Sequence, residues 1–444
     1  MDSPIAGFLR AYADSDTARF HMPGHKGRGP LGCEALDITE IQGADSLYEA
    51  DGIIAQSEQN AAALFGAGRT LYSTEGSSQC IRAMLHLALQ NRPQGSAPVI
   101  LAARNVHKAF VYAAALLDFK PVWLWPEGEN SLLQCPVSVP QVAAALDAMA
   151  QPPAAVYLTS PDYLGGMTDI EAIAKVCHSR GTVLLVDNAH GAYLRFLRPS
   201  RHPMDQGADL CCDSAHKTLP VLTGGAYLHI GKNAPASFAE KARQAMTLFG
   251  STSPSYLTLA SLDLCNQTLA GDYPARLAEM AERLTQLRRR LKDRGWRVEA
   301  TDPLRLSLAA PAGETGLTLA RRLREQAMEC EYADEEHLVL MLTPDNTLEE
   351  LTRLEQALGF APAPPKAKSP LPQARGQQAM SVRQALFAPQ ETIPANQSLG
   401  RVCGAPTVSC PPAVPIAVSG ERIGPEALTL FTHYGVEWVD VVKE

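Results

Sequence analysis

The chain has 444 residues, 46% hydrophobic and 19% charged, a composition that excludes a disordered, collagen-like or coiled-coil chain and allows about two or three globular domains. Lys and Arg number 39 against 47 Asp and Glu, for a formal net charge of −8, and no dense basic run predicts a nucleic-acid partner. The N-terminus lacks an apolar signal region, and no apolar run nears the roughly 20 residues of a membrane span, so we expect a soluble cytoplasmic protein with no membrane partner.

Short apolar runs alternate with longer amphipathic stretches between residues 60 and 230, as in successive β–α–β units. The predicted strands are 70–74, 98–102, 154–160, 182–187, 208–214 and 224–230. The predicted helices lie near 79–90, 106–118, 140–150 and 169–180. We therefore predict an N-terminal arm and active-site loop at residues 1–60 and one large α/β domain with a mostly parallel sheet at residues 61–262.

From residue 255 onward the pattern changes to long helices and then to alternating short strands and helices. The predicted helices are 255–270, 274–295, 317–328 and 347–359, and the predicted strands are 296–300, 304–310 and 338–343. These elements predict a small α+β domain at residues 263–360. Residues 361–380 are rich in Pro and basic side chains, which is typical of an extended linker, and a C-terminal α+β domain follows at residues 381–444.

Ten cysteines are scattered along the chain without a C-x-x-C pair or a metal-ligand spacing. We expect reduced, mostly buried thiols, because free cysteine behaves as a small apolar residue. A disulfide framework or a zinc site is the alternative interpretation, and no metal ligand is assigned.

Asp187 ends the apolar strand predicted at 182–187, and Lys217 follows the strand predicted at 208–214. A lysine after a buried strand is costly unless it has a partner or reaches solvent through a loop. The carboxyl ends of neighbouring parallel strands converge on one crevice, so the two side chains are expected to meet there. A Schiff-base lysine and a carboxylate for the ring nitrogen are what pyridoxal 5′-phosphate (PLP) requires.

A turn of small polar residues, Gly76, Ser77 and Ser78, follows the strand at 70–74 and opens a helix. Its free N–H groups, hydroxyls and helix dipole would suit a phosphate. Serine is also a routine helix cap, so this turn gains weight only beside Lys217 and Asp187.

At this point the chain resembles the Orn/Lys/Arg decarboxylases of the aspartate aminotransferase-like fold, in the short form without the extra N-terminal domain. The resemblance covers nearly the whole chain through ordered motifs: FHMPGHKG (20–27), DITEIQGADSL (37–47), RNVHKA (104–109), LTSPDYLGGMTDI (158–170), VDNAHGAYLRF (186–196), SAHKTLPVLT (214–223), STSPSYLTLASLD (251–263), and SLGRV and SGERI near the C-terminus. It implies a PLP-dependent fold type I domain with a mostly parallel seven-stranded sheet, and a homodimer or larger even-numbered assembly.

The resemblance also implies residue roles. Lys217 would be the Schiff-base lysine, Asp187 the pyridinium partner and His107 the imidazole stacked on the ring; Ser77, Ser78, Ser214 and His216 would hold the phosphate, Ala189 would line the cofactor site, and Ser251 would reach the cofactor of a neighbouring subunit. Either Lys217 or His216 would return the proton to the substrate Cα. His190, His25 and Cys410 are the candidate substrate contacts.

Several of these residues have simpler interpretations. His107 could belong to an exposed dipeptide at a helix start. His190 could pack beneath the ring without touching substrate. His21 and His25 lie in a segment whose Pro and Gly residues predict an ordered loop, which need not be catalytic.

This chain departs from the family pattern in the residues expected to face the substrate. The family usually has Asn where this chain has Glu75, Gly-Asn where it has Cys80-Ile81, and Glu where it has Asn188. It usually has Gln where this chain has Gly224 or Gly225, Tyr where it has Cys410, and Gly where it has Ala413. A carboxylate beside a phosphate is unfavourable unless it points away. The residues expected to bind the cofactor are therefore intact, whereas the residues expected to face the substrate do not identify which amino acid binds.

The expected activity is PLP-dependent decarboxylation of arginine, lysine or ornithine to an amine and CO2, as in polyamine biosynthesis. Glu421 and Glu426 are generic candidates for binding the distal cation of such a substrate. The alternatives are an aminotransferase or lyase reaction on another amino acid, or a non-catalytic PLP-binding homologue.

Overall fold

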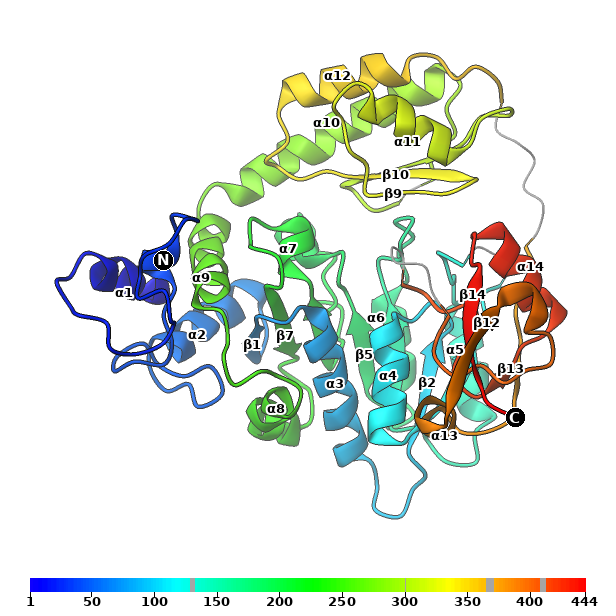
Figure 1. Cartoon of the computed structure of the whole chain (residues 1–444), viewed down its shortest axis with the longest axis horizontal. Helices are drawn as coiled ribbons and strands as arrows, with labels where there is room; N and C mark the ends of the chain where they lie inside the picture. Colours follow the sequence, from blue (N-terminus) through cyan, green and yellow to red (C-terminus); the bar gives the residue numbers. More distant parts are fainter. Residues whose placement is uncertain (128–131, 300, 365–370, 408–412) are drawn as a thin grey trace. The chain divides into compact units, whose positions relative to one another are not determined.

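The computed structural model describes residues 1–127, 132–299, 301–364, 371–407 and 413–444 (Figure 1). The chain divides into two compact units. The first unit contains Met1–Ser96, Ala150–Leu158 and Ile170–Arg276, and the second contains Ala97–Met149, Thr159–Asp169 and Leu277–Glu444. None of the described helices combines the length and the apolar character that a membrane crossing needs.

Seven strands of the described residues form one sheet, in the order β1-β7-β6-β5-β4-β2-β3. Their bounds are β1 Arg69–Ser73, β2 Val99–Ala103, β3 Lys120–Leu124, β4 Ala155–Thr159, β5 Leu184–Asp187, β6 Leu210–Asp213 and β7 Ala226–Ile230. β2 pairs parallel with β3 and β5 with β6, whereas β7 runs antiparallel to both β6 and β1. The predicted strands of this sheet are confirmed, with small shifts at their ends.

Sequence reasoning missed β3, the strand at one edge of the sheet. Lys120 and Pro121 interrupt the apolar run that would have predicted it. An edge strand tolerates such residues, because no neighbouring strand pairs with its outer side. A proline near the start of the strand, which lacks an N–H group, therefore costs little.

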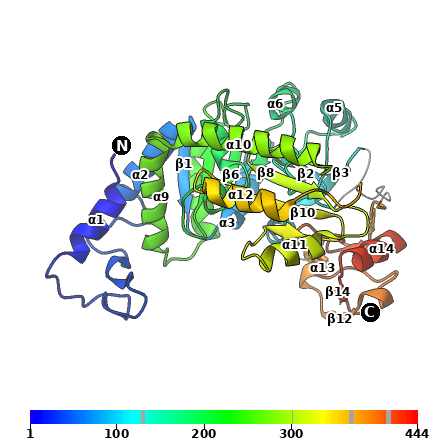
Figure 2. The ribbon, with the colours of Figure 1, turned by 90° about the horizontal axis from the view of Figure 1, so that it is seen from above.

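In the first unit, α3 and α6 cover opposite faces of the sheet (Figure 2). The helices that lie in this unit are α1 Pro4–Ala13, α2 Ile53–Phe65, α3 Ser77–Asn91, α6 Ile170–His178, α7 Ala215–Thr218, α8 Ala236–Leu248 and α9 Tyr256–Ala270, with 3-10 turns η1 Glu34–Leu36 and η2 Ala192–Phe196. α8 packs on α3, while α1, α2 and α9 pack together beside β1. Asp263 of α9 holds α1 and α2 by accepting from Ala6 N (3.0 Å) and Ser57 Oγ (2.5 Å).

The second unit contains a small antiparallel sheet in the order β8-β10-β9. The bounds are β8 Arg305–Ala309, β9 Tyr332–Ala333, β10 His337–Met341, α4 Lys108–Leu117, α5 Val139–Asp147, α11 Gly316–Arg324 and α12 Leu348–Leu358, and α10 Tyr273–Asp293 enters this unit from the first. The strand expected at 296–300 is reduced to one bridge, Val298 to Leu308, and residue 300 is outside the described residues.

The C-terminal elements form two short antiparallel pairs, β11 with β13 and β12 with β14. Their bounds are β11 Gln377–Gln378, α13 Val382–Phe387, β12 Gln390–Pro394, η3 Ala395–Gln397, β13 Glu421–Arg422, α14 Pro425–His433 and β14 Trp438–Val442. Arg104, which follows β2, holds them by donating to the carbonyls of Pro415 (2.8 Å) and Ile416 (3.1 Å) and by pairing with buried Glu421 (3.5 Å).

The small sheet contains a buried, charged histidine that makes stability depend on pH. Burial by itself lowers the pKa of His337, but hydrogen bonds to Asp334 and Glu299 outweigh it and raise the pKa from 6.5 to about 9. The stabilisation is therefore complete below pH 6.5 and is lost as pH rises through about 9, by on the order of 2–3 kcal/mol in the free energy of unfolding. Urea unfolding between pH 6 and pH 9 measures this slope. His337→Gln should flatten it, and an unchanged slope in that variant would contradict the assignment.

Candidate active site

Two neighbouring parallel strands, β5 and β6, bring the lysine and the aspartate to the same edge of the sheet. Asp187 is the last residue of β5 and lies in register with Cys212 of β6. The chain leaves β6 at Asp213 and turns at once into α7, which contains Lys217. Lys217 N donates to the Ser214 carbonyl (3.0 Å) in this turn. The predicted convergence at the carboxyl ends of these strands is therefore present.

Asp187 is buried, with 2% of its surface exposed, and it accepts hydrogen bonds from several sides. The Tyr157 hydroxyl donates to Oδ2 (3.1 Å), and Ala189 N (3.2 Å) and the Cys212 thiol (3.5 Å) donate to Oδ1. Burial raises the pKa of Asp187, while the positive charge of Lys217 and these hydrogen bonds oppose that rise. The site thus holds a carboxylate that gains strongly from a cationic partner.

Sequence reasoning did not identify Tyr157, which lies within the apolar strand β4. The only available signal was a tyrosine in a fully buried run, whose hydroxyl must find a partner. The predicted residue Ala189 contributes through its backbone N–H and not through its side chain.

The amine of Lys217 lies 2.8 Å from Nε2 of His190, which is 7% exposed. An ammonium donates only, so the imidazole nitrogen that faces it accepts. The sequence predicted that His190 contacts the substrate or packs beneath the ring, and in the structure it contacts the lysine amine.

Ser77 and Ser214 meet although 137 residues separate them: the Ser214 hydroxyl donates to the Ser77 oxygen at 2.8 Å. Ser77 and Ser78 are the first residues of α3, whose N-cap is Gly76 in a left-handed conformation (φ 71°). Gly76 N also donates to the carbonyl of Gly224 (2.7 Å). The free N–H groups at the start of this 15-residue helix, together with these hydroxyls, make a favourable cradle for an anion.

Close backbone approach explains why a glycine stands at position 224. A Cβ atom there would lie 2.7 Å from the Thr74 carbonyl oxygen, and the residue has φ 95°. Both features disfavour any side chain at this position.

Two further candidates border this cradle. His216 Nδ1 lies 3.1 Å from the carbonyl oxygen of Gly225, to which it donates. The exposed carboxylate of Glu75 accepts a hydrogen bond from the backbone N of Ser251. Glu75 thereby holds the segment that contains Ser251. This contact gives a structural role to a carboxylate that would be unfavourable if it faced a phosphate.

The remaining predicted residues have local partners in the structure. In the second unit, His107 caps α4 by accepting from Ala109 N (3.1 Å). In the first unit, His25 lies 3.1 Å from Asp37 Oδ2 and accepts from Gly27 N (3.0 Å), while His21 Nε2 lies 2.7 Å from the Tyr12 hydroxyl oxygen.

The candidates from the C-terminal elements differ in their surroundings. Glu421 is 2% exposed and paired with Arg104, whereas Glu426 is exposed. Ala413 has φ 60° and accepts from Lys108 N (2.9 Å), and Cys410 lies outside the described residues. Burial and the pair with Arg104 leave Glu421 poorly suited to binding a substrate cation.

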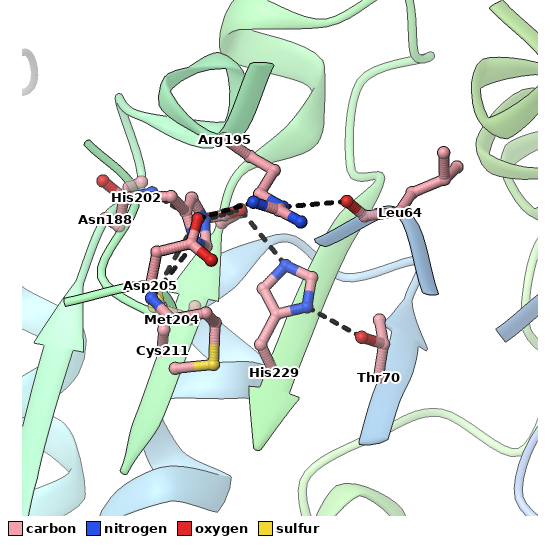
Figure 3. A network of polar contacts seen from close by, with 12 residues as sticks. Leu64, Thr70, Asn188, Arg195, His202, Met204, Asp205, Cys211 and His229 are labelled. Atoms are coloured by element: carbon pink, nitrogen blue, oxygen red, sulfur yellow. Dashed lines mark hydrogen bonds and ion pairs between the residues drawn. The ribbon is translucent and has the colours of Figure 1, made fainter. Parts of the chain in front are cut away.

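A second buried polar cluster lies around Asp213, at the end of β6, and includes His202, Cys211 and His229, which Figure 3 labels. His202, Cys211 and Asp213 each bring one potential metal ligand within 4.8 Å of the others. Burial raises the pKa of the Cys211 thiol well above its ordinary value, whereas the hydrogen bonds and charges of His202 and His229 outweigh burial and lower the pKa of Asp213. These groups already bond to one another, which is the arrangement of a buried hydrogen-bond network.

Comparison with known proteins places this geometry in context. Residues 3–310 match the family model "Orn/Lys/Arg decarboxylase, major domain". The chain is 30% identical to an arginine decarboxylase of Halalkalibacterium halodurans, over 95% of this chain and 91% of that protein. It is 28% identical to an arginine decarboxylase of Bacillus subtilis, over 96% of this chain and 92% of that protein.

Among solved structures, the constitutive lysine decarboxylase of E. coli superposes with a TM-score of 0.79 at 18% identity, over 100% of this chain and 82% of that one. Lysine decarboxylase A from Pseudomonas aeruginosa gives a TM-score of 0.80 at 18% identity, over 99% and 80% of the two chains. At these identities the likeness concerns the fold, and it confirms the predicted α/β class with a mostly parallel sheet.

Proposed function

This chain belongs to the Orn/Lys/Arg decarboxylase family and is a decarboxylase, and from this premise we propose that it removes CO2 from a basic amino acid with the help of PLP. The observation that carries the proposal is the 2.8 Å contact of Lys217 with His190, together with the effect of the Lys217 charge on buried Asp187. Among basic amino acids arginine comes first, because the relatives that match over nearly their whole length include several named arginine decarboxylase. The amine product would suit polyamine biosynthesis.

The residues present fit PLP in three respects. The Lys217 amine would bond to the aldehyde carbon, and buried Asp187 would face the pyridine nitrogen. Ser77, Ser78 and Ser214, with the N-terminus of α3, would hold the phosphate. When bound, PLP supplies the electron sink that accepts the electron pair left by the departing carboxylate.

The side chains of this chain perform the remaining tasks. His190 would accept a proton from Lys217 Nζ and so free the amine for bond formation, a role that the 2.8 Å contact supports. Asp187 would keep its negative charge, because a cationic ring nitrogen compensates the burial that otherwise raises its pKa. Lys217 or His216 would return the proton to the substrate Cα.

A panel of amino acids tests the activity. Purified protein with added PLP should release CO2 and the matching amine from arginine faster than from lysine, ornithine or neutral amino acids. Formation of keto acids without CO2 would instead favour an aminotransferase. Absence of turnover on the whole panel, despite PLP binding, would favour a non-catalytic homologue.

The contact between Ser214 and Ser77 yields a prediction about the cofactor. Ser214→Ala should raise the PLP dissociation constant about 10- to 100-fold, because it removes a hydroxyl that would bond a charged phosphate and that also orients Ser77. Equilibrium titration followed by visible absorbance measures the constant. Ser179→Ala, at an exposed position just after α6, is the matched control, and equal affinities in both variants would contradict the phosphate role.

We also propose that the protein assembles as a homodimer or a larger even-numbered oligomer. The loop after α1 exposes three large apolar side chains in the single chain: Phe20 (95%), Leu31 (82%) and Met22 (67%). Several large apolar side chains exposed on one loop are a common sign of a protein–protein interface. Light scattering of the PLP-loaded protein tests the assembly, and an active monomer would refute it.

A further inference from the structure

Asp213 is fully buried at the end of β6, and side chains from several segments donate hydrogen bonds to it. His202 Nε2 (2.9 Å) and His229 Nε2 (3.2 Å) bond to its Oδ2, while Asn188 Nδ2 bonds to Oδ1 at 2.6 Å. Phe65 packs on both imidazoles, with ring centroids 5.5 Å from His202 and 4.5 Å from His229. These partners, rather than water, therefore solvate the charge of Asp213.

The partners on the far side of each imidazole determine which nitrogen carries the proton. Met204 N donates to Nδ1 of His202 at 3.3 Å, so the proton of that ring lies on Nε2, facing Asp213. His229 Nδ1 lies 2.8 Å from the Thr70 hydroxyl, which can donate to it and leave the Nε2 proton for Asp213 (Figure 3). In this arrangement both imidazoles donate their Nε2 protons to the carboxylate of Asp213.

This network joins the two turns that contain the residues of the proposed site. Asn188 directly follows Asp187, and Asp213 directly precedes Ser214, four residues before Lys217. The side chains of successive strand residues point to opposite faces, so Asp213 lies on the face of the sheet opposite Cys212, the residue that contacts Asp187. Asp213 can therefore influence the site only indirectly, through the backbone of the turn that follows β6.

The identity of residue 188 depends on this carboxylate. Asn188 is fully buried and its amide donates to Asp213 Oδ1 at 2.6 Å. A carboxylate at position 188 would place two buried negative charges within hydrogen-bond distance, which is strongly unfavourable. Asn188 and Asp213 therefore form a complementary pair, in which the amide supplies the donor that the buried carboxylate needs.

We propose that Asp213 and Asn188, supported by His202 and His229, form a positioning pair that holds the turns after β5 and β6 so that Asp187 and Lys217 face the cofactor. The inference rests on the proposed function for the identity of that cofactor. The pair itself is a property of the chain and is testable without any substrate.

Exchanging the two residues tests the pair. Asn188→Asp sets two carboxylates against each other, and Asp213→Asn cannot accept from both Asn188 and the two histidines. In the double variant, the amide introduced at position 213 can donate to the carboxylate introduced at position 188, and its oxygen can still accept from the histidines. Each single variant should raise the PLP dissociation constant at least ~10-fold and lower Tm, and the double variant should return within ~3-fold of wild type.

Two controls separate positioning from general destabilisation. Asn91→Asp makes the same chemical change at the exposed end of α3 and should leave PLP binding unchanged. Leu9→Ala, in the buried face of α1, lowers Tm away from the two turns and should not shift the wavelength of the visible PLP band, which Asn188→Asp should shift. An Asn188→Asp variant that behaves like Leu9→Ala at equal loss of Tm would overturn the positioning role.

Two further outcomes are decisive. Additive effects of the two substitutions on both Tm and PLP affinity would overturn the pair, even in a protein that binds PLP and decarboxylates arginine. Stoichiometric metal in the purified protein, measured by mass spectrometry, would also overturn it, because an ion would replace the protons that face Asp213. A wild-type protein that binds no PLP would instead overturn the proposed function, and the coupling in Tm would still report whether the pair exists.

Discussion

Lys217→Ala is expected to lower the rate of decarboxylation at least ~10³-fold, because the variant loses both the covalent attachment of PLP and a candidate acid for the substrate Cα. Borohydride treatment of the wild-type protein should fix PLP on a peptide that contains Lys217. Mass spectrometry of a digest measures this directly, and the variant should yield no such peptide.

The control for this experiment is Lys175→Ala, which removes an exposed lysine that pairs with Glu171 along α6 at 2.6 Å. That variant should keep full activity and the fixed peptide, since an exposed pair of this kind contributes little to stability. Reduced PLP on a lysine other than Lys217 would refute the assignment of the site.

Asp187→Asn should lower kcat at least ~100-fold while Lys217 still binds PLP, because the amide preserves the shape of the side chain and removes the charge that faces the pyridine nitrogen. Tyr157, Ala189 and Cys212 all donate to this carboxylate, so the amide also leaves one of these donors facing an NH2 group. Steady-state kinetics on arginine, with PLP content measured by absorbance, separates lost turnover from lost cofactor.

Asp209→Asn is the matched control for Asp187→Asn. Asp209 is also buried, at the opposite end of the same pair of strands, where it accepts from Leu184 N (2.7 Å) and lies 2.9 Å from His178 Nε2. Its replacement should lower Tm and leave kcat nearly unchanged. Equal losses of kcat in the two variants would mean that Asp187 serves the fold and not the reaction.

Local patterns were sufficient to predict most elements of this protein. The alternation of apolar runs and amphipathic stretches predicted β5, β6 and β7 and the helices between residues 255 and 359, because strand and helix periodicities are properties of short segments. The edge strand β3 was not predicted, because its lysine and proline interrupt the apolar run by which a strand is identified from local sequence.

The pairing of Asp187 with Lys217 was also predictable from the chain alone, because one ends a strand, the other closely follows the next, and parallel strands bring such positions together. The side chains that surround these two residues depend on the folded arrangement of the chain. The contacts of Tyr157 with Asp187, of His190 with Lys217 and of Asn188 with Asp213 join side chains that lie 25 to 30 residues apart. No local period encodes which of several buried polar residues will meet: strand register and the direction of each turn select the partners, and both are properties of the assembled sheet.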